Sequence, residues 1–181
     1  MKIKKITTPR LYLDLLRPQD ADRLFTYRSL PEVYTFQSWQ PGNNSEVLHF
    51  IQRYSGSIEI ARDEWKQLGI YLRDTQRLIG DCGFILFQET QAEIGYTIAP
   101  DSQRQGYGSE AAGGLVGFLF GALGLHRVIA RVDPQNQASI KLLRGLGFRQ
   151  EGHSIKSALV RGVWQDDVLF AMLQEEWQAN V

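Results

Sequence analysis

The stretch from residue 92 to residue 109, AEIGYTIAPDSQRQGYGS, decides the fold. Apolar side chains alternate over residues 94–98, which predicts a strand, and a polar loop follows it. Gly106 and Gly108 then open an apolar run, which predicts a helix. Glycines let a ligand approach the main chain closely, and the free N–H groups at a helix start attract anions. The stretch therefore predicts a strand, a phosphate-binding loop and a helix.

The whole chain has an ordinary composition. Its 181 residues are expected to form a single domain over residues 1–181. The 20 Lys and Arg residues balance 20 Asp and Glu residues, which argues against a nucleic-acid partner. Cys82 is the one cysteine, and no Cys/His cluster has the spacing of a zinc site, so we expect a reducing, cytoplasmic setting and no metal. The longest apolar run, residues 115–125, is too short to span a bilayer, so we expect no membrane partner.

Periodicity and turn residues predict the elements on either side of the opening stretch. The expected fold class is α+β (α/β), with a mixed, mostly antiparallel central sheet of six to seven strands flanked by about four helices. Further strands are expected over 11–16, 68–72, 78–87, 127–133, 148–159 and 163–173. Helices are expected over 19–30, from an N-cap at Asn44 or Ser45 to about 62 with a break at Gly56, from 107 to about 123, and within 134–147.

The two glycines also fit a second kind of loop. Gly106-x-Gly108-x-x-Ala111 satisfies the dinucleotide fingerprint. In that fold, however, the first glycine follows directly on a buried parallel strand. Here six polar or turn-forming residues, 100–105, intervene, and the preceding strands are expected to be joined by hairpins. A dinucleotide-binding enzyme is therefore the less favoured alternative.

Residues 103–108, QRQGYG, resemble the Gln/Arg-x-x-Gly-x-Gly/Ala signature of the Gcn5-related N-acetyltransferases (GNAT). In that family the loop holds the pyrophosphate of acetyl-coenzyme A by main-chain amides. Asn136-x-x-Ser139-x-x-Leu142 and residues 147–148, GF, resemble the second half of the family, where the asparagine meets the pantetheine arm. The two motifs together favour this family over the dinucleotide enzymes.

Both ends of the chain add to the resemblance. Residues 8–21, with TPRL and LRPQDA, and residues 162–177, with GVWQD, look like the branch that contains the ribosomal-protein N-terminal (alanine/serine) acetyltransferases. The resemblance covers about residues 8–177 and implies a GNAT-like fold. It also implies acetyl-coenzyme A as co-substrate and direct transfer to a primary amine, on a protein N-terminus or a small molecule, without a covalent enzyme intermediate. A monomer or homodimer is expected, and a catalytically silent acyl-coenzyme A-binding or sensory domain is the alternative.

Direct transfer needs a proton acceptor, because an amine is protonated at neutral pH. Glu93 is the candidate base, since related enzymes carry a working glutamate in this region. A structural glutamate paired with a basic side chain is the alternative. The departing thiolate needs a proton donor, but the position of the family's usual tyrosine matches Leu143. Ser139 is the substitute, although it could equally cap a helix or touch the coenzyme.

The remaining candidate residues are expected to contact the cofactor or the acceptor. Tyr34, Phe36 and Trp39 could wall an acceptor pocket, although packing of their loop onto the core is the favoured interpretation. The expected cofactor-binding residues are Ile98, Ala99, Arg104, Gln105, Gly106, Tyr107, Gly108, Ser109, Asn136, Lys141 and Arg144.

Overall fold

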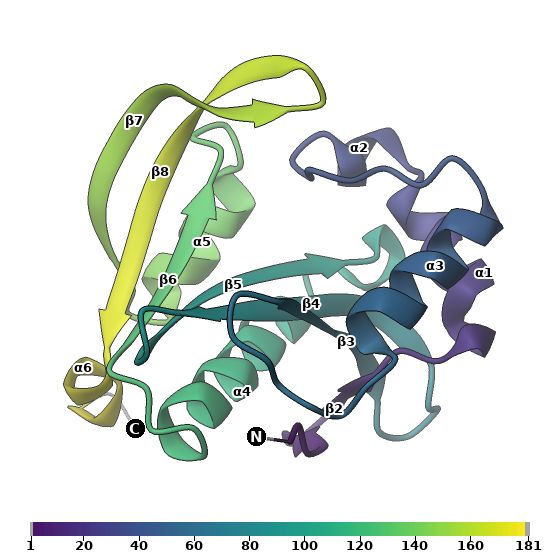
Figure 1. Cartoon of the computed structure of the whole chain (residues 1–181), viewed down its shortest axis with the longest axis horizontal. Helices are drawn as coiled ribbons and strands as arrows, with labels where there is room; N and C mark the ends of the chain where they lie inside the picture. Colours follow the sequence, from purple (N-terminus) through teal and green to yellow (C-terminus); the bar gives the residue numbers. More distant parts are fainter. Residues whose placement is uncertain (1, 180–181) are drawn as a thin grey trace.

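One mixed sheet organises the computed structural model, which describes residues 2–179 (Figure 1). The strand order is β1-β2-β3-β4-β5-β6-β8-β7, and all neighbours are antiparallel except the parallel pair β5 and β6. The strands are β1 (Ile6–Thr7), β2 (Leu11–Leu15), β3 (Trp65–Leu72), β4 (Leu78–Phe87), β5 (Gln91–Ile98), β6 (Arg127–Val132), β7 (Arg149–Val160) and β8 (Val163–Leu173). The helices are α1 (Ala21–Arg28), α2 (Pro31–Tyr34), α3 (Asn44–Ser55), α4 (Tyr107–Gly121), α5 (Gln137–Gly145) and α6 (Gln174–Ala179), with 3-10 turns at Pro18–Asp20 and Pro100–Ser102.

The mixed, mostly antiparallel sheet confirms the expected fold class. The described residues form eight strands and six α-helices, somewhat more than expected. The additional elements are short: β1 has two residues, α2 has four and α6 has six. Segments of this length show no measurable periodicity, so pattern analysis does not detect them.

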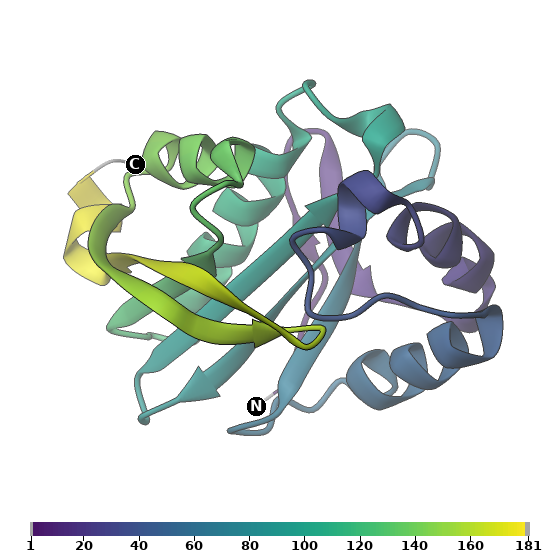
Figure 2. The same ribbon diagram turned by 90° about the horizontal axis from the view of Figure 1, so that it is seen from above.

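Helices cover both faces of the sheet (Figures 1 and 2). Leu68 and Ile70 of β3 belong to the core that α4 and α5 complete, whereas Tyr71 belongs to the core under α1 and α3. This division follows from the alternation of side chains along a strand. The small residues of α4 allow a close approach: a Cβ on Gly114 would lie 2.7 Å from the Cγ2 of Thr8. No helix within residues 2–179 has the length and apolar character needed to cross a membrane.

Helix α3, the second of the four helices expected from the sequence, is shorter than expected. Its N-cap is Asn43, whose Oδ1 accepts from the N–H of Glu46 at 3.0 Å, one residue before the expected position. The helix ends at Ser55, so the expected continuation to about residue 62 is wrong. The Ser55 hydroxyl donates to the Gln67 carbonyl of β3 at 2.6 Å, and the chain beyond it forms isolated bridges with residues 2 and 86. Pairing with the sheet replaces the helical bonds there.

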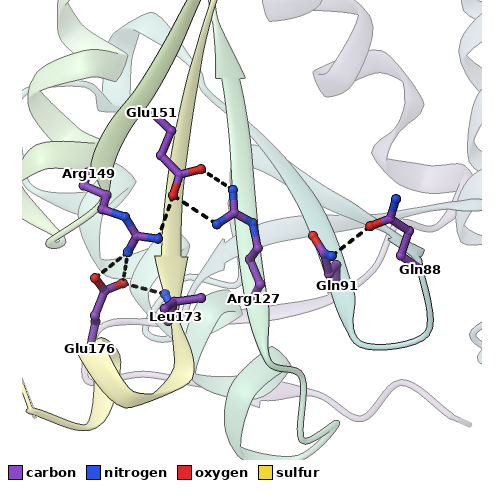
Figure 3. A network of polar contacts seen from close by, with 7 residues as sticks. All are labelled: Gln88, Gln91, Arg127, Arg149, Glu151, Leu173 and Glu176. Carbon is purple, nitrogen blue, oxygen red and sulfur yellow. Dashed lines mark hydrogen bonds and ion pairs between the residues drawn. The ribbon is translucent and has the colours of Figure 1, made fainter.

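A polar cluster fastens the C-terminal helix to the sheet at the end where β6 begins (Figure 3). Arg149 of β7 donates to Glu151 at 2.6 Å and also pairs with Glu176 of α6. Glu176 accepts in addition from the N–H of Leu173 at 2.7 Å. Arg127 of β6 donates to Glu151 at 3.0 Å. We call these four charged residues the Arg149 cluster; it ties β6, β7, β8 and α6 together.

Candidate active site

β5 and β6 are paired over only part of their length. The parallel register joins residues 91–93 to residues 127–129. Beyond that point β5 continues beside β4 as far as Ile98, while β6 continues beside β8 as far as Val132. The carboxyl ends of the two strands therefore part, as Figure 1 shows. Within the described part of the chain, the facing edges of both strands have no strand partner there, which leaves backbone groups available to a ligand.

Residues 99–106, which we call the glycine loop, connect β5 to α4 and contain the 3-10 turn Pro100–Ser102. Gly106 is the N-cap residue, with φ +79° and ψ 0°, and Arg104 also has a positive φ of 60°. The first bond within the helix runs from the N–H of Glu110 to the Gly106 carbonyl. The preceding N–H groups, of residues 107–109, have no acceptor inside the helix. The structure thus puts the expected phosphate loop at the amino end of a helix; Arg104, Gln105, Gly106 and Ser109 are exposed.

The amino end of α5 lies next to this loop. Leu142 of α5 packs so closely on Gly108 that a Cβ there would lie 2.9 Å from its Cδ1. A larger residue here would force the Leu142 side chain to move, so this packing favours a glycine whether or not a ligand is bound, a reason that the sequence did not show. Asn136 caps α5, since its Oδ1 accepts from the N–H of Ser139 at 3.1 Å. Its amide nitrogen remains available to another group.

Tyr96 of β5 is a site residue that the sequence reasoning missed. Its hydroxyl lies 2.8 Å from the Oγ of Ser139, and either oxygen can donate. Burial raises the pKa of Tyr96 to about 12, so the phenol keeps its proton at neutral pH. In the sequence Tyr96 counts as an apolar member of the alternation with Ile94 and Ile98. Of Ile94, Tyr96 and Ile98, Tyr96 alone has a hydroxyl group, and that difference is the signal that could have identified it as a candidate.

Other residues of α5 differ in their surroundings. Leu143 is fully buried in the core, so the position of the family's usual tyrosine carries no polar group. Arg144 is exposed; its Nη2 donates to Gln150 of β7 at 3.2 Å. Lys141 is also exposed.

Two further cofactor candidates lie where β5 meets the glycine loop. Ile98, at the end of β5, is half-buried, and Ala99, the first residue of the loop, is fully buried.

Glu93 is on the opposite face of β5 from Tyr96. Its Oε2 lies 3.5 Å from the Nε of Arg131, and Arg131 also donates to Asp167 at 3.0 Å. We call these three residues the Arg131 cluster. Burial raises the pKa of Glu93, and the charge of Asp167 raises it further, whereas Arg131 lowers it; the net direction is upward. Glu93 is thus paired with a basic side chain, as the structural alternative expects, yet it is a better proton acceptor than an exposed carboxylate.

A cavity of about 490 Å³ opens on the same face of the sheet as Glu93. Trp65 connects the two: its indole lies over Gly95, where a Cβ would be 3.3 Å from its Cη2. Trp39 stacks on Phe50 with ring centroids 4.3 Å apart. The lining residues are Arg28, Gln37, Ser38, Trp39, Glu46, His49, Phe50, Arg53, Tyr54, Trp65 and Gln67.

The three aromatic candidates for the acceptor pocket do not lie together in the structure. Trp39 lines the cavity, whereas Tyr34 and Phe36 do not belong to its lining. Tyr34 is the last residue of α2. Arg161, between β7 and β8, donates to the Tyr34 carbonyl at 2.6 Å and lies 4.9 Å from the centre of its ring. Phe36 is half-buried in the loop after α2.

Two further features concern covalent and metal chemistry. Cys82 is fully buried, and burial raises the pKa of its thiol well above its usual range, which leaves it a poor nucleophile. Among residues 2–179 no three His, Cys, Asp or Glu side chains are grouped as metal ligands would be.

Comparison with known proteins identifies acetyltransferases as relatives of this chain. The family model of the acetyltransferase (GNAT) domain matches residues 10–149. The uncharacterized N-acetyltransferase p20 of Bacillus licheniformis is 32% identical over 97% of this chain and 99% of its own length. The ribosomal protein uS5-alanine N-acetyltransferase of Escherichia coli K12 is 26% identical over 96% of this chain and 92% of its own. A crystal structure of a GNAT-family acetyltransferase from Bacillus anthracis superimposes with a TM-score of 0.86 at 26% identity, covering 95% of this chain and 99% of the other.

Proposed function

The chain belongs to the GNAT family of acetyltransferases, and we propose that it moves an acetyl group from acetyl-coenzyme A directly to the amine of a protein N-terminus. One observation carries the proposal. A proton acceptor, Glu93, and a proton-donor pair, Tyr96 and Ser139, flank β5 on opposite faces where it parts from β6. Acyl transfer to an ammonium group removes two protons from the nitrogen, one of them before the attack, and supplies one proton to the departing sulfur.

The residues around this opening fit acetyl-coenzyme A. The co-substrate supplies the acetyl group as a thioester, and its pyrophosphate matches the anion-attracting amino end of α4. Gly106 is exposed and has no side chain to obstruct the approach. The free edge of β5 beyond Glu93 offers backbone donors and acceptors to the amides of the pantetheine arm. Asn136 keeps an amide nitrogen for the same arm.

Glu93 is the general base in this proposal. Its raised pKa brings the carboxylate closer to the range in which proton transfer at neutral pH is efficient. Arg131 keeps the carboxylate ionised and oriented, because it is itself fixed by Asp167. The carboxylate therefore takes the proton of the incoming ammonium group, directly or through one water.

As the carbon–sulfur bond breaks, Ser139 gives its hydroxyl proton to the sulfur and receives the Tyr96 proton in its place, and a proton released by the acylated nitrogen restores Tyr96. When the Tyr96 hydroxyl donates to the Ser139 Oγ, the serine proton is directed away from Tyr96 and toward the opening. The serine is in the first turn of α5, where the helix dipole stabilises negative charge. Buried Cys82 supports a route without an acylated thiol.

The acceptor assignment rests on the relative that acts on ribosomal protein uS5 and on the cavity beside Trp65. Aromatic rings and the polar side chains of Glu46, His49 and Arg53 line it, which suits the first side chains of a peptide. A small amine would leave most of its volume unfilled.

The test is an acetylation panel read by mass spectrometry. Acetyl-coenzyme A is incubated with the protein and with peptides of varied N-terminal residues, polyamines and aminoglycosides. We expect one acetyl group on the α-amine of a subset of peptides. Transfer only to small amines would contradict the protein acceptor, and binding of acetyl-coenzyme A without transfer to any amine would indicate a silent coenzyme-binding domain.

A further inference from the structure

Arg10, just ahead of β2, reaches across to the loop that opens α4. Its Nη1 donates to the carbonyl oxygen of Gln105 at 2.9 Å. Its Nε donates to Glu110 of α4 at 2.6 Å, and its backbone N–H donates to the other oxygen of the same carboxylate at 2.7 Å. The guanidinium also lies 4.5 Å from the centre of the Tyr107 ring. One side chain thus touches residues on both sides of Gly106.

The bond to Gln105 sets the direction of an N–H group. A peptide unit is planar and trans, so its carbonyl oxygen and its N–H point in opposite directions. The carbonyl of Gln105 and the N–H of Gly106 belong to the same unit. Because Arg10 holds the oxygen on its own side, the N–H of Gly106 is directed away from Arg10.

The alternative orientation of this unit is accessible and would be harmful to anion binding. Gly106 has a positive φ of 79° and a ψ of 0°. A flip of the Gln105–Gly106 peptide would change the φ of Gly106 from a positive to a negative value, which a glycine also adopts readily. The flip would exchange the N–H for the carbonyl oxygen, which repels phosphate. Glycine itself therefore does not fix the orientation of this peptide.

Glu110 anchors the arginine. Besides its two bonds from Arg10, its carboxylate accepts from the Thr8 hydroxyl at 2.6 Å. Burial alone would raise the pKa of Glu110, but the bonds from Thr8 and Arg10 lower it, so the carboxylate stays charged at neutral pH. The N-terminal segment, the loop and the first turn of α4 are thereby joined.

We propose that Arg10 is a positioning residue for the coenzyme: it holds the Gln105–Gly106 peptide with its N–H facing the pyrophosphate, and Glu110 holds Arg10. The inference rests on the proposed function of the loop. It assigns to the N-terminal segment a role in coenzyme affinity, exerted through the main chain.

The test compares the affinity of Arg10→Met and the unchanged protein for coenzyme A by isothermal titration calorimetry. We expect binding to weaken about ten-fold, as for the loss of one charge-assisted hydrogen bond. KM for acetyl-coenzyme A should rise by a similar factor with kcat retained. Affinity for acetyl-pantetheine, which has no pyrophosphate, should not change.

Arg73→Met is the matched control. Arg73 donates to the carbonyls of Thr8 and Pro9 at 3.1 and 2.9 Å, so it holds the same segment and carries the same charge without touching the loop. We expect its thermal stability to fall with coenzyme affinity retained. Equal loss of affinity in both variants would overturn the inference, because general charge or segment order would then explain it.

Glu110→Ala separates positioning from direct charge. Removing an acidic group beside an anion site should tighten binding if charge alone acts, whereas loss of the anchor should weaken it. We expect weaker binding. Tighter binding, or unchanged affinity in Arg10→Met, would contradict the role of Arg10. Failure of the unchanged protein to bind coenzyme A would instead contradict the proposed function of the loop.

Discussion

The Arg149 cluster and the Arg131 cluster lie at opposite ends of β6 and are built from the same groups. Each contains an arginine between two carboxylates. In the Arg149 cluster the pKa values of both glutamates are lowered: Arg127 is the main cause at Glu151, and the N–H of Leu173 is the main cause at Glu176. In the Arg131 cluster the pKa of Glu93 is raised.

The difference comes from hydration and contact geometry. Glu151 receives hydrogen bonds from two arginines, one at 3.0 Å and one at 2.6 Å. Glu93 is 3.5 Å from its arginine, which is too far for a strong hydrogen bond, so the cost of its burial outweighs the ion pair. The same residue types therefore have carboxylates with lowered pKa values at the start of β6 and a carboxylate with a raised pKa near its end.

The largest expected effect is on catalysis in Glu93→Gln. The amide cannot accept a proton, so we expect kcat/KM at neutral pH to fall by roughly 100- to 10,000-fold. The raised pKa of Glu93 means that its contribution to stability is present at low pH and lost as the pH rises through that pKa. The variant should therefore be as stable as the unchanged protein at pH 7, or slightly more. Acetyl-peptide formation and thermal unfolding measure the two quantities, with Glu151→Gln as control. Retained turnover would exclude Glu93 as the base.

The second prediction concerns pH dependence. Arg131 lowers the pKa of Glu93 and Asp167 raises it. In Arg131→Met the acidic limb of the kcat/KM profile should therefore move to higher pH, and in Asp167→Asn to lower pH, so that the two variants differ several-fold in activity on that limb. Rate measurements across the pH range on the same peptide test this. Parallel shifts in the two variants would show that the limb reports another group.

A smaller effect is expected from Glu176→Gln in the Arg149 cluster. Partly exposed ion pairs contribute about 0.2–1 kcal/mol, so the free energy of unfolding should fall by about that amount, with turnover unchanged. Because the pKa of Glu176 is lowered, its stabilisation is present above the ordinary carboxyl pKa and lost as the pH falls through the lowered value. Urea unfolding should show that the difference in free energy of unfolding between the variant and the unchanged protein is smaller at acidic pH than at neutral pH. A gap that widens in acid would contradict the assignment.

The smallest effect is that of salt. The Arg149 cluster is partly exposed, so about 1 M salt should reduce the stability difference between Glu151→Gln and the unchanged protein by a few tenths of a kcal/mol. The acidic limb of the unchanged enzyme should shift less, because burial rather than the ion pair dominates at Glu93. Unfolding and rate measurements at low and high salt compare the clusters. Equal sensitivity would remove the distinction between them.

Local sequence patterns predicted much of the fold correctly. The strand predicted at residues 94–98 lies within β5, and the strands predicted at 148–159 and 163–173 are β7 and β8. The helix predicted within 134–147 is α5, and the N–H groups of Gly147 and Phe148 bond back to its last turn. Each of these depends on interactions within a few residues. The expected break at Gly56 is where α3 ends, but the expected continuation to about residue 62 is wrong, because residues 59 and 62 form bridges with the distant residues 2 and 86.

The candidate site also combines features that local sequence predicts with contacts that it does not. The glycine loop could be placed from sequence, because helix starts have local signatures, whereas the cap of α5 is Asn136 and not Ser139, the possible cap that the sequence suggested. The pairing of Tyr96 with Ser139, the contact of Arg10 with Gln105 and the link from Glu93 to Asp167 through Arg131 could not. Each joins residues from separate elements.

By itself, the sequence determined the order of strands and helices, the loop at Gly106 and the family resemblance that the comparisons confirm. Only the tertiary structure decided which side chains meet and how far each is removed from water. Those two factors set the raised pKa of Glu93 and the pairing of the Tyr96 and Ser139 hydroxyls. The physical reason is that turn preference and periodicity act over neighbouring residues, whereas desolvation and distant hydrogen bonds exist only once the elements have packed.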